Sequence, residues 1–338
     1  MEKLRFAVVG CGNIGKRHIA VIDAEPEAEL VALCDKDEER MKELGRNYSN
    51  VACYTSYQQL LAESNANIIS ICTPHGLHAE MSILAAQAGK QILVEKPMAL
   101  NVADSTRMIE EAQKHGVNLY VVKQNRFNRP ITLTQQALEE KRLGKVFMVQ
   151  CNVLWNRHQR YYDESEWRGR KALEGGCLHT QVCHFLDLLT WWFGPLKEAH
   201  TILDTFNHEI EIEDCGVSAL RFQSGILGSL TWTTCVYNVN YEGSITIIGE
   251  KGTIKIGGKY LNEIEFWDVQ SYPLPQDVEY VDAPNIYAHY QGSSSNHNQL
   301  INQLVKQVIE RRHGLVEGVE GRKTIEAIEM IYGGKHRH

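Results

Sequence analysis

The chain has 338 residues, of which 43% are hydrophobic and 23% charged, and its formal net charge is −7. A chain of this length exceeds one ordinary core and predicts two globular domains. The negative charge argues against a large nucleic-acid surface, but a basic pocket for an anionic small molecule stays compatible with it.

The opening residues, MEKLRFAVVG, enter a strand pattern directly and lack the features of a signal peptide. No run approaches the roughly 18 apolar residues of a membrane helix, so no membrane partner is expected. The cysteines are scattered without CxxC pairs, as is typical of reduced cytoplasmic thiols. Cys177 and Cys183 flank a histidine, but their spacing fits no common zinc site, and we expect no metal.

The first third of the chain alternates apolar runs with helical patterns. The expected strands are Leu4–Val9, Leu30–Cys34, Ile68–Cys72, Ile92–Val94 and Leu119–Val122, and the helical stretches include Asp37–Tyr48, His78–Ala88 and Val102–His115. This alternation predicts βαβ units and a doubly wound parallel sheet covered on both faces, hence an α/β domain over residues 1–123.

Beyond residue 124 the pattern changes to that of an α+β domain. Helical patterns occur at Pro130–Leu143, His184–Trp192, Asn296–Arg311 and Arg322–Ile331, and strand patterns at Val146–Leu154, Val217–Phe222, Ile226–Thr233, Ser244–Gly249, Thr253–Ile256 and Ile264–Trp267. Short turns between strands predict an antiparallel meander within a large, mostly antiparallel sheet. We expect residues 124–338 to form a second domain whose exposed sheet face packs on another copy, giving a homodimer or homotetramer.

The first strand ends in a glycine-rich turn, Gly10-Cys11-Gly12-Asn13-Ile14-Gly15, that opens a helix. Gly10 permits the tight turn, Gly12 lets a pyrophosphate approach the backbone, and Gly15 lets helix and strand pack closely. Asp35 ends the next strand, 20 residues after Gly15. A carboxylate there accepts hydrogen bonds from ribose hydroxyls and repels a 2′-phosphate, so the pattern predicts NAD as the cofactor.

A buried strand leads into the turn Glu95-Lys96-Pro97. Ligands bind at the carboxyl ends of parallel strands, so Lys96 is placed near the expected crevice. Pro97 restricts the backbone of Lys96 to extended geometry. From its position alone, Lys96 is equally compatible with a surface lysine at a turn.

Two further segments carry polar groups suited to a substrate. Thr180, His184 and Asp187 are spaced to share a helical face, and histidine exchanges protons near neutral pH. The stretch from Trp155 to Gly169 contains arginines and aromatic residues, which suit phosphates or carboxylates and sugar or base faces. A structural histidine and a solvated loop are the alternative interpretations.

The segments GCGNIGKRH, CTPHGLH, ILVEKP and GGCLHTQVCHFLDLLTWWFG occur in the order seen in the Gfo/Idh/MocA oxidoreductases, which the chain resembles over nearly its whole length. The resemblance implies a Rossmann domain and a mixed-sheet domain that carries the substrate site, with Lys96 and His184 at catalytic positions. Thr180 stands where the family pattern GGxxxDxxxHxxD has aspartate, which narrows the acid–base roles to Lys96 and His184 without deciding between them. The glycine turn and the resemblance together give the expected cofactor contacts, which are Gly10, Gly12, Asn13, Ile14, Asp35, Thr73, Pro74, His78, Glu95, Lys96 and Arg126.

The segments KQNRFN, YYDESEWRG, IEIEDCGVSALRF and EGSITIIGEKGTIKIGG resemble one subgroup of this family. That subgroup oxidises C3 of UDP-N-acetyl-glucosaminuronic acid in bacterial lipopolysaccharide and O-antigen sugar pathways. The substrate contacts expected are Lys96, Gln124, Asn125, Arg157, Tyr161, Trp167, Arg168, Thr180 and His184. Another sugar or inositol dehydrogenase, an NAD-dependent glycosidase and a non-catalytic NAD sensor are the alternatives, and retention of both Lys96 and His184 argues against the sensor.

Overall fold

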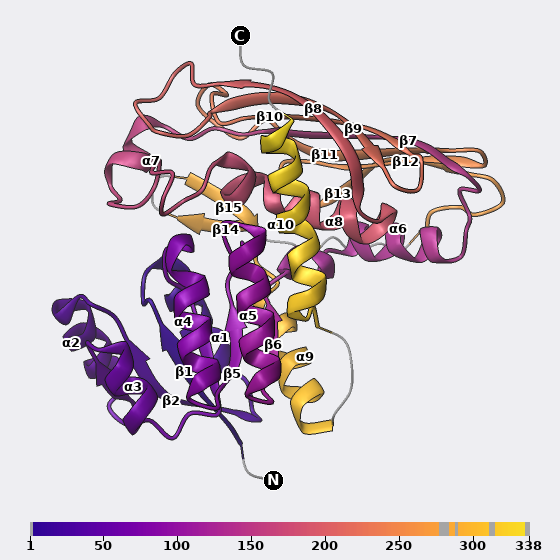
Figure 1. Cartoon of the computed structure of the whole chain (residues 1–338). Helices are drawn as coiled ribbons and strands as arrows, with labels where there is room; N and C mark the ends of the chain where they lie inside the picture. Colours follow the sequence, from indigo (N-terminus) through magenta and orange to yellow (C-terminus); the bar gives the residue numbers. More distant parts are fainter. Residues whose placement is uncertain (1–2, 277–283, 288–289, 311–314, 335–338) are drawn as a thin grey trace. The chain divides into compact units, whose positions relative to one another are not determined.

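The computed structural model describes residues 3–276, 284–287, 290–310 and 315–334 (Figure 1). By internal contacts the chain divides into two units, Met1–Lys123 with His297–Ile325, and Gln124–Asn296 with Glu326–His338. The sequence assigned all of 124–338 to the second domain. Residues 297–325 group instead with the first unit, because α9 (His297–Glu310) packs against α1 (Asn13–Asp23). Arg311, the expected end of the α9 stretch, lies outside the described residues.

The first unit is built on a six-stranded sheet in the order β3-β2-β1-β4-β5-β6. All five neighbouring pairs run parallel. The strands are β1 (Leu4–Val9), β2 (Ala28–Cys34), β3 (Ala52–Tyr54), β4 (Ile68–Ile71), β5 (Gln91–Val94) and β6 (Leu119–Val121). This is the doubly wound strand order of dinucleotide-binding domains and confirms the predicted fold class. Strand β3 was not predicted, because its three residues are too short to show a period.

Helices connect these strands: α1, α2 (Glu38–Asn47), α3 (Tyr57–Glu63), α4 (His78–Gln87) and α5 (Val102–Lys114). Helices α4 and α5 lie side by side (Figure 1). Asp37, Ser56 and Asn101 each accept a backbone hydrogen bond from the first turn of α2, α3 and α5, which satisfies an otherwise unpaired N–H group. The helix α10 (Gly318–Gly333) contributes residues to both units.

The second unit contains a seven-stranded sheet in the order β13-β12-β11-β7-β10-β9-β8. The strands are β7 (Val146–Leu154), β8 (Leu196–Asp204), β9 (Cys215–Phe222), β10 (Leu227–Thr233), β11 (Glu242–Gly249), β12 (Gly252–Gly257) and β13 (Glu263–Val269). The expected single meander is in fact two three-stranded meanders separated by β7. Strand β7 pairs parallel with β10 and antiparallel with β11, so the sheet is mixed and mostly antiparallel. A separate two-stranded sheet pairs β14 (Pro284–Tyr287) with β15 (Tyr290–Ser294).

The core side of the seven-stranded sheet is apolar. Alternate residues such as Val149, Leu220 and Trp232 are buried on it. The helices of this unit include η2 (Gln124–Phe127), α6 (Arg129–Glu139), α7 (Gln159–Asp163), η3 (Leu178–Val182) and α8 (Cys183–Phe193). Segment η3 is a π-helix that continues into α8, and such wide turns occur frequently at functional sites.

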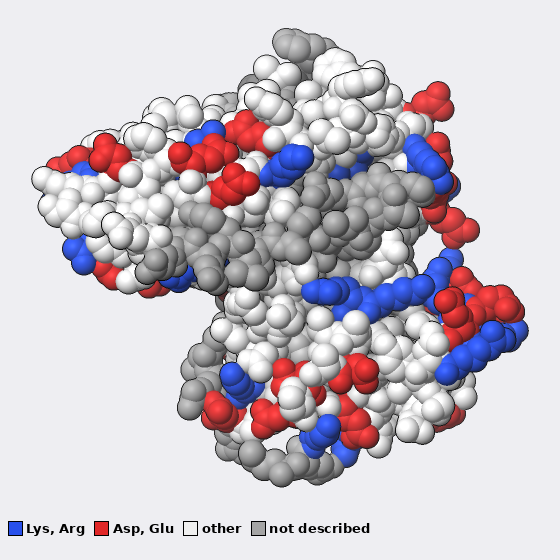
Figure 2. Space-filling view, turned by 180° about the vertical axis from the view of Figure 1, so that it is seen from behind, with Lys and Arg blue, Asp and Glu red and all other residues white. Residues whose placement is uncertain are grey.

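Within the described part of the chain, no helix combines the length and apolar character needed to cross a membrane. On the face drawn in Figure 2, basic and acidic side chains lie beside one another over both units. This mixture agrees with the modest net charge of −7.

Candidate active site

The glycine turn between β1 and α1 has the geometry that a phosphate cradle requires. Gly10 has φ of +85°, and a Cβ on it would lie 2.7 Å from the carbonyl oxygen of Cys72. A Cβ on Gly15 would lie 1.9 Å from the carbonyl oxygen of Gly10, so only glycine allows this helix and strand to pack. A Cβ on Gly12, by contrast, would meet no described atom within 4 Å. Gly12 therefore faces open space at the N-cap of α1, where Asn13 and Ile14 begin the helix and its N–H groups favour an anion.

Asp35 follows β2 and is nearly buried beside this turn. Its Oδ2 accepts the N–H of Cys11 at 2.7 Å, and its Oδ1 accepts the N–H of Asp37 at 3.1 Å. Arg40, which the sequence analysis did not single out, places Nη1 2.9 Å from Oδ2 of Asp35. The carboxylate is thus held at the edge of the cradle, where an adenosine ribose is expected, and its charge is partly balanced by Arg40.

Thr73, Pro74 and His78 follow the end of β4. The His78 ring is fully buried, with Nε2 2.9 Å from the carbonyl oxygen of Thr73 and Nδ1 2.7 Å from that of Pro97. Burial lowers the pKa of His78, and a neutral ring donates only one hydrogen bond, to Thr73 or to Pro97. His78 therefore ties together the segments that follow β4 and β5, the strands whose ends border the cradle.

Glu95 and Lys96 leave the end of β5. Glu95 is buried, whereas the Lys96 side chain is half-buried, and the Lys96–Pro97 peptide bond is cis. The backbone N–H of Lys96 donates to Oε2 of Glu95 at 3.0 Å. Lys96 therefore lies at the carboxyl edge of the parallel sheet in the first unit, where it was expected.

In the second unit, η2 carries Gln124, Asn125 and Arg126. Arg126 forms a two-point ion pair with Asp187 of α8 and lies over the Trp191 ring, 4.3 Å from its centroid. Asn125 is buried, yet neither polar atom of its side chain has a hydrogen-bond partner among the described residues. A buried amide without partners is uncommon in a folded protein and favours a site that a bound molecule completes.

The arginine and aromatic residues expected to bind substrate form one stacked group in the second unit. The guanidinium carbon of Arg157 lies 5.3 Å from the ring centroid of Tyr161, and that of Arg168 lies 4.1 Å from it. Arg168 also lies 5.7 Å from the Trp167 ring. Arg157 is buried and donates to the carbonyl oxygen of Asn156 and to Oδ1 of Asn240. Two cations stacked at one tyrosine provide a place for an anionic or planar group.

Thr180 and His184 occupy consecutive helical segments of different type. Thr180 lies on the π-helix η3 and His184 on α8, and both side chains are nearly buried. The expected shared face holds by regular spacing for His184 and Asp187, which both lie on α8. Thr180 lies on the preceding π-helix, and its share in that face stays a prediction.

Sequence reasoning did not identify two clusters, one buried and one largely buried. His18, Glu95 and His297 meet in the first unit, and His208, Asp214 and Cys235 meet in the second. The ligand atoms in each cluster lie within 4.8 Å of one another, which is close enough to hold a metal ion. His18 lies three residues after Gly15, so the sequence pattern could have placed it on the helix that follows the glycine turn. Nothing in the local pattern connected His297 with it.

The parallel sheet, the glycine cradle and the Asp35 carboxylate define a dinucleotide-binding oxidoreductase fold. A family profile described as "Oxidoreductase family, NAD-binding Rossmann fold" matches residues 4–123, and the profile of the GFO/IDH/MocA C-terminal domain matches residues 131–255. The chain therefore belongs to the Gfo/Idh/MocA oxidoreductase family, and NAD is its cofactor, as predicted.

Solved structures extend the likeness over the whole chain. A WlbA dehydrogenase from Chromobacterium violaceum, in complex with NADH and UDP-GlcNAcA, is 36% identical, with a TM-score of 0.91 and coverage of 99% of this chain and 94% of that one. The WlbA dehydrogenase from Bordetella pertussis with the same ligands is 35% identical, with a TM-score of 0.89 and coverage of 99% and 98%. Among curated proteins, myo-inositol 2-dehydrogenase from Thermotoga maritima is 28% identical over 74% of each chain.

Proposed function

We propose that this NAD-dependent oxidoreductase oxidises the C3 hydroxyl of a UDP-linked N-acetyl-glucosaminuronic acid to the 3-keto sugar, in bacterial surface polysaccharide biosynthesis. The observation that carries the proposal is the likeness, at 35% and 36% identity over 99% of the chain, to two dehydrogenases crystallised with NADH and UDP-GlcNAcA. The inositol dehydrogenase likeness favours a second candidate, oxidation of a free polyol, but it covers only 74% of the chain at 28% identity.

The arginine–aromatic group supports a charged, nucleotide-linked substrate over a neutral polyol. Arg157 and Arg168 supply fixed positive charge, and a UDP-uronate carries both a pyrophosphate and a carboxylate. Tyr161 and Trp167 offer aromatic faces for a base or sugar ring. Gln124, the unpaired amide of Asn125, and Thr180 add neutral hydrogen-bonding groups suited to sugar hydroxyls.

NAD⁺ supplies the chemistry of hydride acceptance at the carbon that is oxidised. The chain's own task is to remove the hydroxyl proton and to hold the sugar so that its C–H bond is aligned. In the proposal Lys96 and His184 share that proton exchange, one accepting the hydroxyl proton and the other orienting the oxygen. Thr180, where the family pattern has a carboxylate, orients without accepting the proton.

Turnover with a substrate panel tests the proposal. Purified protein is mixed with NAD⁺ and UDP-GlcNAcA, UDP-GlcNAc, UDP-glucuronate or myo-inositol, with and without 2-oxoglutarate to reoxidise bound NADH, and products are identified by mass. The expected result is a product two mass units lighter from UDP-GlcNAcA alone, lost in Lys96→Ala and His184→Ala but kept in the surface controls Lys114→Ala and His115→Ala. Oxidation of myo-inositol in preference to every UDP-sugar would contradict the substrate assignment.

We also propose a homodimer or homotetramer built on the open face of the seven-stranded sheet. Ile202 and Val217 are cross-strand neighbours there, 65% and 51% exposed, and Leu227 and Met148 form a second exposed apolar pair. Apolar patches of this kind mark interfaces. Light scattering of Ile202→Lys is expected to give a smaller assembly than the parent chain, and an unchanged mass would contradict this interface.

A further inference from the structure

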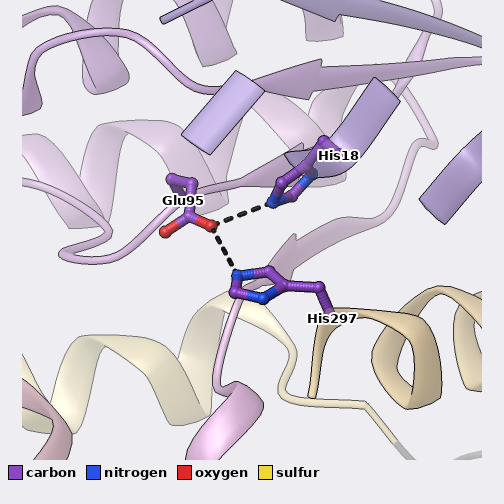
Figure 3. Close-up of side chains that lie close together, drawn as sticks. All are labelled: His18, Glu95 and His297. Atoms are coloured by element: carbon purple, nitrogen blue, oxygen red, sulfur yellow. Dashed lines mark hydrogen bonds and ion pairs between the residues drawn. The ribbon is translucent and has the colours of Figure 1, made fainter. Parts of the chain in front are cut away.

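Three side chains from distant parts of the sequence meet inside the first unit (Figure 3). His18 comes from α1, Glu95 follows β5, and His297 is the first residue of α9. Each is at most 4% exposed. Nε2 of His18 lies 2.9 Å from Oε1 of Glu95, and Nε2 of His297 lies 3.4 Å from the same oxygen. One carboxylate oxygen is therefore held between two imidazole rings.

The charges in this cluster follow from burial and from these contacts. Burial alone would raise the pKa of Glu95, but the hydrogen bond from His18 and the nearby His297 ring hold it well below its usual range. Burial lowers the pKa of His297, so its ring is neutral, and its Nε2 faces Oε1 of Glu95 at 3.4 Å, a long contact that falls short of hydrogen-bond geometry. Burial likewise opposes protonation of His18, but Cys72 and Glu95 outweigh it and raise the pKa of His18 to about 10. The cluster thus contains one cation, one anion and one neutral ring.

The second oxygen of Glu95 connects the cluster to the Lys96 turn. Oε2 accepts the backbone N–H of Lys96 at 3.0 Å. A carboxylate is planar and rigid, so restraining Oε1 also restrains Oε2. His18 is itself anchored, with Nδ1 2.8 Å from Oγ of Ser70 on β4. His297 provides the remaining contact and brings α9, 201 residues after Lys96 in the chain, against the Lys96 turn.

The same three groups could also hold a metal ion, because their ligand atoms lie within 4.8 Å of one another. A metal ligand needs a free lone pair on the histidine nitrogen. Nε2 of His18 lies only 2.9 Å from Oε1 of Glu95, a hydrogen-bond distance that is shorter than the separation of two ligands at about 2.0–2.1 Å from a tetrahedral ion, so the contacts favour a hydrogen-bonded pair.

We propose that His297 is a positioning residue for Lys96, acting through Glu95. His297 restrains Oε1 of Glu95, and Oε2 of the same carboxylate then holds the backbone N–H of Lys96 in place. The position of the Lys96 backbone sets where its side chain begins. The inference rests on the proposed part of Lys96 in proton exchange. A misplacement of about 1 Å at such a group lowers turnover by up to about 100-fold.

Three variants separate positioning from general packing. His297→Leu removes the donor and keeps the volume similar, whereas His297→Gln keeps an N–H donor. Leu304→Ala, a buried residue two turns further along α9, is the matched packing control. We expect His297→Leu to lower kcat by about 10- to 100-fold, with KM values for NAD⁺ and sugar within about twofold. His297→Gln is expected to recover most of that loss, and Leu304→Ala to lower the melting temperature with kcat retained.

Amide hydrogen exchange at Lys96 provides a readout that does not depend on the substrate. Of the variants, only His297→Leu is expected to speed this exchange, because the backbone N–H of Lys96 then loses Glu95 as a fixed acceptor. Unchanged exchange in His297→Leu, or equal changes in Leu304→Ala, would overturn the proposal. Faster exchange with unaltered kcat would also overturn it. If the parent chain oxidises no UDP-sugar, the proposed function fails. The exchange measurement still decides whether His297 acts on the Lys96 backbone through Glu95. One metal ion per chain by elemental analysis, lost in His297→Leu, would replace the proposal with a metal site.

Discussion

Arg126 and Asp187 form a two-point ion pair in which Nε and Nη2 each lie 2.8 Å from a different carboxylate oxygen. Asp187 is almost fully buried, and the Arg126 side chain is 13% exposed. The pair joins η2 to α8, the helix that carries His184. Arg126 was expected to contact the cofactor, and that role stays a prediction. Within the second unit, its ion pair with Asp187 holds η2 against α8.

Removing the charge of Asp187 is therefore expected to destabilise the fold. Asp187→Asn leaves the Arg126 guanidinium partly buried without its counter-charge, a change that typically costs about 3–5 kcal/mol. Arg160→Ala, which breaks an exposed pair with Glu164, is the control and is expected to cost about 1 kcal/mol or less. Urea unfolding measures both. Equal, small losses would mean that the Arg126 pair contributes little to stability.

The glycine turn permits a separation of folding from cofactor binding. Gly12→Ala meets no described atom within 4 Å, so the chain is expected to fold normally and to bind NADH at least tenfold more weakly, because the methyl group obstructs the pyrophosphate. Gly15→Ala would place a carbon 1.9 Å from a backbone oxygen and is expected to destabilise the protein itself. Thermal melting and NADH fluorescence titration distinguish the two. Normal NADH affinity in folded Gly12→Ala would contradict the proposed cradle.

The Asp35–Arg40 contact predicts how cofactor choice can be shifted. Asp35→Ser removes the carboxylate expected to meet the ribose hydroxyls and frees Nη1 of Arg40 to face a 2′-phosphate, while Nη2 stays 3.2 Å from Asp37. NAD⁺ affinity is expected to fall about 10- to 100-fold while NADP⁺ affinity rises. Asp37→Ser, at the cap of α2, is the control and should keep the preference for NAD⁺. A retained preference in Asp35→Ser would show that other residues set cofactor choice.

The buried His18–Glu95 pair predicts a pH dependence of stability. The pKa of His18 is raised from 6.5 to about 10, so its contribution is fully present below pH 6.5 and is lost as the pH rises towards 10. The pKa of Glu95 is lowered, so its contribution is present above about 4.5 and is lost only as the pH falls below that value.

Urea unfolding between pH 6 and 10 is the measurement for this pair. His18→Asn is expected to be destabilised by a few kcal/mol, on the order of a broken buried pair, near pH 6.5. The difference from the parent chain should shrink towards pH 10. Titration of groups common to both proteins cancels in that difference. A constant difference across the range would show that His18 is not charged in the folded protein.

Much of this architecture was predictable from local pattern. The period of apolar residues gave β1 and β7 with their observed bounds and most other strands within two residues. The glycine turn, Asp35 and the Lys96 turn were found because their roles depend on short spacings and on the strand that precedes them. Strand β8 was not predicted, since charged and apolar residues alternate irregularly along LKEAHTILD.

The sequence by itself determined the class of fold, the NAD cradle and the family, because each is encoded within a few tens of residues. Only the tertiary structure placed β7 between two meanders and grouped residues 297–325 with the first unit. It alone paired Arg126 with Asp187. It also brought His297 to Glu95, 202 positions earlier in the chain. Such pairings depend on which buried polar groups must satisfy one another once the core has formed, and local periodicity carries no information about them.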